Sequence, residues 1–176
     1  MALRALRFEG DPILRKVAKP VKEINERIRQ TLSDMVETMY EDNGVGLAGP
    51  QIGVLRRLVT IDVGEGPIKM INPEIIEKSE ETELDIEGCL SLPKFNGTVI
   101  RPTTVTVKYL DENGEEHIKT GSHLFARCVC HEIDHLNGIL FRDIVEKVID
   151  MEHLTEDMIE YMRENNLLSQ EKPEEE

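Results

Sequence analysis

The chain has 176 residues, of which 39% are hydrophobic and 32% charged, and its formal net charge is −14 at pH 7. This length suits one domain with a sizeable core, and the acidic balance argues against general binding to nucleic acids or anionic membranes, because both require basic patches. The N-terminal residues do not resemble a signal peptide, no segment approaches the roughly 20 apolar residues of a membrane span, and three cysteines suit a reducing compartment, so we expect a cytoplasmic protein without membrane contact.

The first half of the chain predicts two helical segments, a glycine-rich loop and several short strands. A turn at Gly10 precedes a short helical stretch over 13–18, which Pro20 ends. From 24 to 40 the apolar residues recur at helical spacing, which predicts an amphipathic helix packed on the core. The glycine-rich segment covers 44–53. Short β-prone runs follow at 58–61, 68–71 and 74–77.

The second half of the chain predicts a hairpin followed by two helices. The alternating run 103–110 turns back into a second strand over 115–120. Apolar spacing then predicts a helix that is capped by Ser122 and stops at Gly138. A final amphipathic helix is predicted over about 155–168.

The order of these elements favours one fold class. Helix, strands and helix follow one another without regular βαβ alternation, which indicates an α+β fold with antiparallel β-sheets packed around a central helix. We expect a single domain over 1–168. The acidic residues 169–176 are expected to form a disordered tail.

A five-residue segment of the predicted central helix reads HEIDH and places His131 and His135 one turn apart. Side chains four residues apart lie on one helix face, about 6 Å apart at Cβ, so the two imidazoles can hold one metal ion. Glu132 is then placed to act as an acid and base on a metal-bound water. Chance occurrence on a surface helix is the alternative, but Leu124 and Cys128 lie on the same helix face and favour an inward orientation.

The spacing leaves the third metal ligand open. One metalloprotease class places a histidine six residues after the second, but Phe141 stands there and cannot bind a metal. A second class uses a downstream glutamate, for which Glu152 and Glu156 are suitably placed. Cys89 stands at the end of a strand-like stretch. It offers a thiolate, which is a strong ligand for zinc or iron(II), although a buried inert thiol is the simpler interpretation of that residue alone.

The segment GVGLAG at 44–49 matches the glycine pattern of dinucleotide-binding sites. It follows a predicted helix instead of a strand, and Pro50 stands where a helix should run, so we reject a dinucleotide site. The glycines instead predict a backbone that closely approaches a ligand or another strand. Gln51 offers a neutral amide donor beside it.

Three separated segments together resemble the peptide deformylase family. They are GVGLAGPQ at 44–51, EGCLS at 87–91 and HEIDH at 131–135, in this order and at these separations. The likeness extends from Gly10 to about Leu140, and the conjunction of three motifs is far more specific than the histidine pair alone.

The resemblance implies a metal-dependent hydrolase that removes the formyl group from the N-terminal formylmethionine of nascent polypeptides and releases formate. It implies one divalent metal, usually iron(II), with zinc, nickel or cobalt able to occupy the site. The implied metal ligands are Cys89, His131 and His135. The implied catalytic groups are Glu132 as acid and base, and the Gln51 amide and the Leu90 backbone N–H as donors to the developing oxyanion.

The resemblance also implies a substrate-binding surface. Val45 and Gly46 are expected to pair with the peptide backbone in a strand-like way. Leu124, Arg127 and Cys128 are expected to line an apolar pocket for the methionine side chain, with Arg127 contributing only its aliphatic stem.

Two positions depart from the family pattern, and one buried pair is expected. Gly49 stands where alanine is common, which should loosen the loop. Cys130 stands where glutamine is common, which raises the question of thiol oxidation near the site. Glu87 and Arg101 are expected to form a buried pair that supports the metal loop.

Two other functions are compatible with the histidine pair. A conventional metallopeptidase would take its third ligand from Glu152 or Glu156. A non-catalytic structural site would need four protein ligands, with Cys128 as the nearest spare donor. Transient contact with the ribosome is expected, and the last helix is its candidate surface.

Overall fold

The computed structural model of the chain describes residues 2–168, so the expected acidic tail at 169–176 lies outside the described residues. One group of strands comprises β1 (Gly46–Ala48), β2 (Leu58–Ile61), β3 (Ile68–Lys78), β6 (Thr104–Leu110) and β7 (Glu116–Ser122). A second group comprises β4 (Thr82–Cys89), β5 (Leu92–Pro102) and β8 (Lys147–Ile149). The helices are α1 (Glu26–Glu41), α2 (Leu124–Leu136) and α3 (Glu156–Glu164), with short 3-10 turns η1 (Pro12–Arg15), η2 (Gly49–Ile52) and η3 (Phe141–Asp143).

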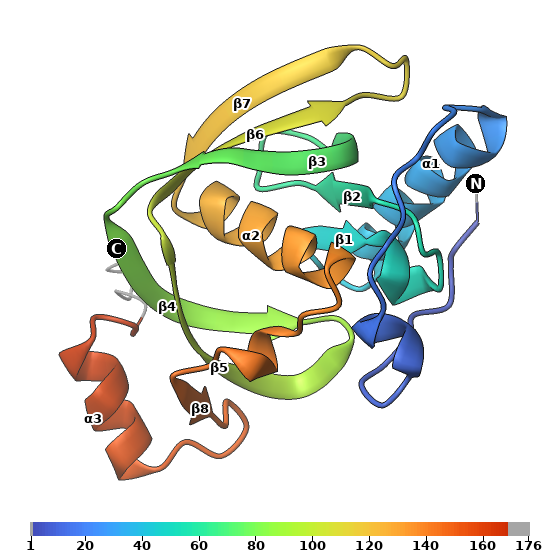
Figure 1. Cartoon of the computed structure of the whole chain (residues 1–176). Coiled ribbons are helices and arrows are strands. Elements are labelled where there is room, and N and C mark those ends of the chain that lie inside the picture. The colour runs from blue at the N-terminus through green and yellow to red at the C-terminus, as the bar shows by residue number, and fades with distance from the viewer. Residues whose placement is uncertain (1, 169–176) are drawn as a thin grey trace, which may run out of the picture.

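The strands form two antiparallel sheets with α2 between them (Figure 1). The larger sheet has the order β1-β2-β3-β6-β7, and the smaller has the order β4-β5-β8. Since α2 contacts strands of both sheets, its side chains can meet residues from either one. The predicted α+β fold with antiparallel sheets around a central helix is confirmed.

The helix α1 forms as its apolar spacing predicts. The Asn25 side chain accepts a hydrogen bond from the backbone N–H of Ile28 and caps the first turn. Met35 and Met39 are fully buried and pack in one cluster with Leu58 of the larger sheet. This packing fixes the start of the glycine-rich segment, which leaves α1 directly toward β1.

The strands differ from the prediction in two places. The predicted runs 68–71 and 74–77 are halves of one strand, β3, which is interrupted where Asn72 adopts a φ of 51°. The side chain of Asn72 bonds the backbone of Val21, which holds this bend in place. The hairpin β4–β5 was not predicted beyond a strand-like run before Cys89, because its strands contain acidic residues, glycine and proline that weaken the β signal.

Helix boundaries also differ. The prediction that Ser122 caps α2 was wrong: Ser122 ends β7, and His123 occupies the cap position with a φ of 55°. The last helix ends at Glu164, earlier than predicted, and the stretch over 13–18 is a 3-10 turn of four residues. Within the described range 2–168, we find no helix with the length and apolar character needed to cross a bilayer.

Candidate active site

The two motif histidines lie on the buried face of α2. His131 and His135 are 8% and 1% exposed, and their ring centroids are 4.9 Å apart. Phe125, Ala126 and Val129 of the same helix are buried in the core. The helix therefore directs both imidazoles inward, as the apolar spacing predicts.

Cys89 supplies the third donor of this cluster. It is the last residue of β4, next to an irregularity in the pairing of β4 with β5, and its Sγ lies 3.3 Å from His135 Nε2. Donor atoms of Cys89, His131 and His135 all lie within 4.8 Å of one another. Two ligands of one tetrahedral ion would be roughly 3.5 Å apart, given the usual zinc–sulfur and zinc–nitrogen distances. The donor set therefore fits a divalent metal.

The glutamates considered as alternative ligands do not join this cluster. Glu152 is exposed and pairs with Lys94 at 3.4 Å, and Glu156 begins α3. Among residues 2–168, the metal-capable group that contains both motif histidines is completed by Cys89. The position of β4 therefore identifies Cys89, and not Glu152 or Glu156, as the third donor of this cluster.

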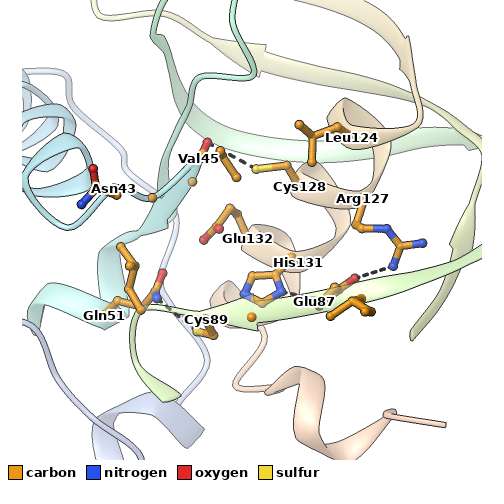
Figure 2. A pocket seen from close by; sticks show the side chains of 15 residues that line it. Asn43, Val45, Gln51, Glu87, Cys89, Leu124, Arg127, Cys128, His131 and Glu132 are labelled. Carbon is orange, nitrogen blue, oxygen red and sulfur yellow. Dashed lines mark hydrogen bonds and ion pairs between the residues drawn. The ribbon is translucent and has the colours of Figure 1, made fainter. Parts of the chain in front are cut away.

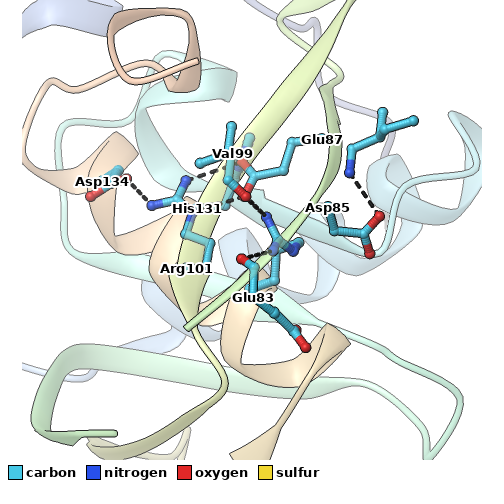
Figure 3. A network of polar contacts seen from close by, with 9 residues as sticks. Glu83, Asp85, Glu87, Val99, Arg101, His131 and Asp134 are labelled. Carbon is cyan, nitrogen blue, oxygen red and sulfur yellow. Dashed lines mark hydrogen bonds and ion pairs between the residues drawn. The ribbon is translucent and has the colours of Figure 1, made fainter. Parts of the chain in front are cut away.

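A buried carboxylate orients His131 (Figure 3). The Nδ1–H of His131 donates to Glu87 Oε2 at 2.9 Å, which leaves Nε2 for the cluster. Arg101 donates to both oxygens of Glu87, at 2.8 and 3.0 Å, and to Asp134 Oδ2 at 2.6 Å. Burial alone would raise the pKa of Glu87, but the hydrogen bonds from His131 and Arg101 outweigh it and lower that pKa to about 2. The expected Glu87–Arg101 pair is present.

Glu132 faces the cavity from the same helix. Its side chain is buried, and its Oε2 has no hydrogen-bond partner within the part of the chain that the structure describes. Burial raises the pKa of Glu132 to about 7. A carboxyl group with a pKa near neutrality can both accept and release a proton, which suits an acid and base.

Gln51 is held in one orientation beside Cys89. The Oε1 atom of Gln51 accepts from the backbone N–H of Ala48 at 2.8 Å. Its Nε2 therefore faces the cluster, 3.2 Å from Ser91 Oγ and 3.5 Å from Cys89 Sγ. The turn η2 thus presents an amide donor at the side of the metal-capable group.

A cavity of about 350 Å³ joins these groups (Figure 2). This volume falls within the usual range of small-ligand sites. Ten of the sequence-predicted site residues line this cavity: Val45, Gly46, Gln51, Cys89, Leu90, Leu124, Arg127, Cys128, His131 and Glu132. The eleventh, His135, belongs to the metal-capable cluster with Cys89 and His131. Sequence reasoning missed Asn43 and Ile86 of its wall, because the strand β4 that carries Ile86 was not fully predicted.

The two cysteines of α2 lie on different faces. Cys128 lines the cavity, as expected, and burial raises the pKa of its thiol well above the ordinary value. Cys130 lines a second cavity behind α2, with Ile133 and Asn137. The departure from the family pattern at Cys130 therefore lies outside the cavity that contains Glu132.

Gly49 is enclosed by the loop that follows it. A methyl group at Gly49 would lie 2.6 Å from the carbonyl oxygen of Arg56 and 2.7 Å from that of Val54. The backbone at Val54 and Arg56 therefore occupies the space that a side chain at position 49 would need. The expected effect of Gly49 on the mobility of the loop stays a prediction.

Known proteins share both the sequence and the fold of this chain. Residues 4–150 match the family model described as polypeptide deformylase. The peptide deformylase of Acetivibrio thermocellus is 54% identical over 165 residues, which cover 94% of each chain. That of Thermoanaerobacter pseudethanolicus is 56% identical over 152 residues, which cover 86% of this chain and 95% of the relative.

Solved structures give the same result. The crystal structure of peptide deformylase from Thermotoga maritima superposes with a TM-score of 0.81 at 44% identity, over 83% of this chain and 99% of that one. The peptide deformylase from Synechococcus elongatus, solved in complex with actinonin, gives a TM-score of 0.80 at 40% identity, over 95% of this chain and 88% of that one. With its cluster of Cys89, His131 and His135 in place, this chain belongs to the peptide deformylase family.

Proposed function

We propose that this chain removes the formyl group from the formylmethionine at the amino end of nascent polypeptides and releases formate. The observation that carries the proposal is the convergence of three groups on one cavity: the metal-capable cluster, the carboxylate of Glu132 and the oriented amide of Gln51. The Oε2 atom of Glu132 has no hydrogen-bond partner among residues 2–168. These are the components that hydrolysis of a formyl amide requires.

Cys89, His131 and His135 would hold the divalent metal, and we expect iron(II), with zinc, nickel or cobalt as replacements. Such an ion would act as a Lewis acid: it would lower the pKa of a water molecule toward neutrality and would polarise a carbonyl group. The chain's own residues then decide where the protons move and where the substrate lies.

Glu132 accepts a proton from the attacking water and delivers it to the leaving nitrogen, which becomes the new amino terminus. The amide of Gln51 and the backbone N–H of Leu90 donate to the oxygen of the formyl group as negative charge develops on it. Both donors sit on short turns beside Cys89, so they are in place before the reaction begins.

The peptide would bind along the free edge of β1. This strand is the first of the larger sheet, and the carbonyl oxygen of Val45 already accepts from the backbone N–H of Asp62. Antiparallel pairing alternates, so the N–H and C=O groups of Gly46 should point to the open edge, where a peptide can add as a strand. Leu124, Cys128 and the stem of Arg127 would surround the methionine side chain.

The decisive experiment measures formate release from an N-formylmethionyl tripeptide by the nickel-loaded protein, with Glu132→Gln as the control. We expect formate with an intact peptide chain from the wild type, and a loss of about 10²–10⁴-fold in the variant, which is the usual contribution of a general acid and base. A metal-loaded wild type that releases no formate would contradict the proposal, and internal peptide cleavage would favour the metallopeptidase alternative.

We place this activity in the cytoplasm, where nascent chains emerge, and we keep α3 as the candidate ribosome contact. This helix packs at the outer side of β5 and β8, where Tyr161 bonds Thr98. The cavity lining includes no residue of α3, so this helix can touch a second surface while the cavity stays open.

A further inference from the structure

Arg127 lines the cavity only with its stem. Its guanidinium turns away from the cavity toward Glu87 (Figure 2). There Nη1 donates to Glu87 Oε1 at 3.0 Å and to the carbonyl oxygen of Val99 at 2.9 Å. Nη2 donates to the carbonyl oxygen of Glu83 at 3.1 Å. The side chain is 6% exposed. A buried charged group therefore lies behind the cavity wall, against the carboxylate that orients His131.

The carboxylate of Glu87 has no position left for another donor. A carboxylate has about four lone-pair positions. Oε1 accepts from Arg101 Nε and Arg127 Nη1, and Oε2 accepts from Arg101 Nη2 and His131 Nδ1. Any rotation of this carboxylate breaks at least one charge-assisted hydrogen bond, so its orientation is fixed from three sides.

The charges around Glu87 balance only when Arg127 is counted. Arg101 is shared between Glu87 and Asp134, so two carboxylates face one arginine on that side. Arg127 adds the second positive charge at 3.0 Å from Glu87. Without it, Arg101 alone would have to hold both carboxylates, and the contact between Glu87 and His131 would lose one of its supports.

We infer that Arg127 is a positioning residue for the metal centre: its guanidinium fixes Glu87, and Glu87 fixes the ring of His131. The inference depends on the metal site proposed above. Groups that orient a metal-bound histidine from behind contribute about 10–100-fold to metal affinity. Arg127 is one contact further from the metal site than Glu87, so its contribution to metal affinity should lie near the lower end of this range, at about tenfold.

The test uses cobalt(II)-loaded protein and the variant Arg127→Met, which keeps an unbranched apolar stem and loses the guanidinium. We expect cobalt release to a chelator to become about tenfold faster, with a changed visible absorption spectrum. The matched control is Arg57→Met, because the guanidinium of Arg57 donates to the carbonyl oxygen of Leu136 and to Asn137 Oδ1, near the other end of α2. This control should leave cobalt release and the spectrum unchanged.

A double variant separates positioning from general stability. In the Glu87→Gln background, Arg127→Met should change cobalt release by less than about twofold, because the residue acts through Glu87. The inference is overturned if Arg127→Met accelerates release equally in both backgrounds, or if it lowers only the melting temperature. If Arg127→Met does not fold, Arg127→Lys replaces it, since lysine keeps the charge but cannot make all three contacts, and unchanged cobalt release would again overturn the inference. A wild type that binds no cobalt would refute the proposed metal site itself.

Discussion

Gly46 decides how closely the strand β1 approaches Glu132. A methyl group at this position would collide with Glu132 Oε1 and lie 2.7 Å from Cys128 Sγ. The backbone can therefore pass beside the carboxylate only because the residue has no side chain.

We predict that Gly46→Ala lowers kcat/KM for formate release about 100-fold, because Glu132 must move by roughly 1 Å to accept the methyl group. The metal content should stay unchanged, since the three atoms nearest to the added group belong to Glu132 and Cys128. Steady-state kinetics together with metal analysis checks this prediction. Activity within threefold of the wild type would mean that the carboxylate tolerates the displacement.

At the scale of elements, the junction between β7 and α2 carries backbone strain. His123 has φ 55° and ψ −118°, which are the angles of the first central residue of a type II′ turn, a position that favours glycine. The side chain of His123 is exposed and bonds Glu83 at 2.8 Å, and an exposed pair of this kind contributes little. The junction therefore stores strain that its own side chain does not offset.

We predict that His123→Gly stabilises the fold by about 1 kcal/mol and raises the melting temperature by about 2–4 °C. The matched variant His123→Ala loses the contact with Glu83 and keeps the strain, so it should melt below the wild type. Differential scanning calorimetry of the three proteins distinguishes the two effects. Equal melting temperatures for the glycine and alanine variants would show that the junction is not strained.

The N-terminal segment is tied to α1 by one carboxylate. Asp34 accepts from the backbone N–H of Ala2 at 2.9 Å, from Arg4 Nε at 2.8 Å and from Gln30 Nε2 at 2.8 Å. Burial alone would raise the pKa of Asp34, but these hydrogen bonds outweigh it and lower that pKa. Further along, the N–H groups of Arg7 and Glu9 donate to the carbonyl oxygens of Gln51 and Ser91, so the segment also fastens both loops of the site.

We predict that Asp34→Asn lowers the free energy of unfolding by about 1–2 kcal/mol at pH 7. Because the folded pKa of Asp34 lies below its unfolded value, the contribution is present above pH of about 4 and is lost as the pH falls through the folded pKa. Urea unfolding at pH 7 and pH 3 should therefore give a difference between wild type and variant that shrinks at the lower pH. A difference that stays constant would assign the effect to packing.

At the scale of the whole molecule, the site lies where the two sheets meet across α2. Cys89 comes from the smaller sheet, the histidines come from α2, and Gly46 comes from β1 at the edge of the larger sheet (Figure 1). Gln51 comes from the turn η2, which follows β1. Each sheet has a hydrophobic cluster of its own against a helix or turn. A bound metal would therefore join parts that fold without it.

We predict that a chelator lowers the melting temperature by about 5–10 °C while the far-ultraviolet circular dichroism stays the same. Ligand at about 100 times its dissociation constant stabilises the folded state by about 2.7 kcal/mol, and each kcal/mol shifts the melting temperature by about 2–4 °C at this chain length. Cys89→Ala should melt at the same temperature with and without chelator. A wild type insensitive to chelation would contradict a metal held between α2 and β4.

The local sequence pattern was sufficient to predict elements whose periodicity is carried by consecutive residues. The spacing of apolar residues predicted α1, α2 and the β6–β7 hairpin, because helical and strand periodicities are properties of consecutive residues. The same spacing placed His131 and His135 on the buried face. The same approach did not predict the β4–β5 hairpin, because its acidic residues, glycine and proline have low β-propensity. Pairing of the two strands along their length stabilises this hairpin.

The sequence by itself determined the family, because three motifs in fixed order identify it without coordinates. Tertiary structure alone decided how the site residues act on one another. Cys89, Glu87 and Arg127 are separated by up to 40 residues, and only the packing of β4 and β5 against α2 brings a thiolate to His135 and two arginines to one carboxylate. Contacts between distant segments depend on how whole elements pack, and local periodicity carries no information about that packing.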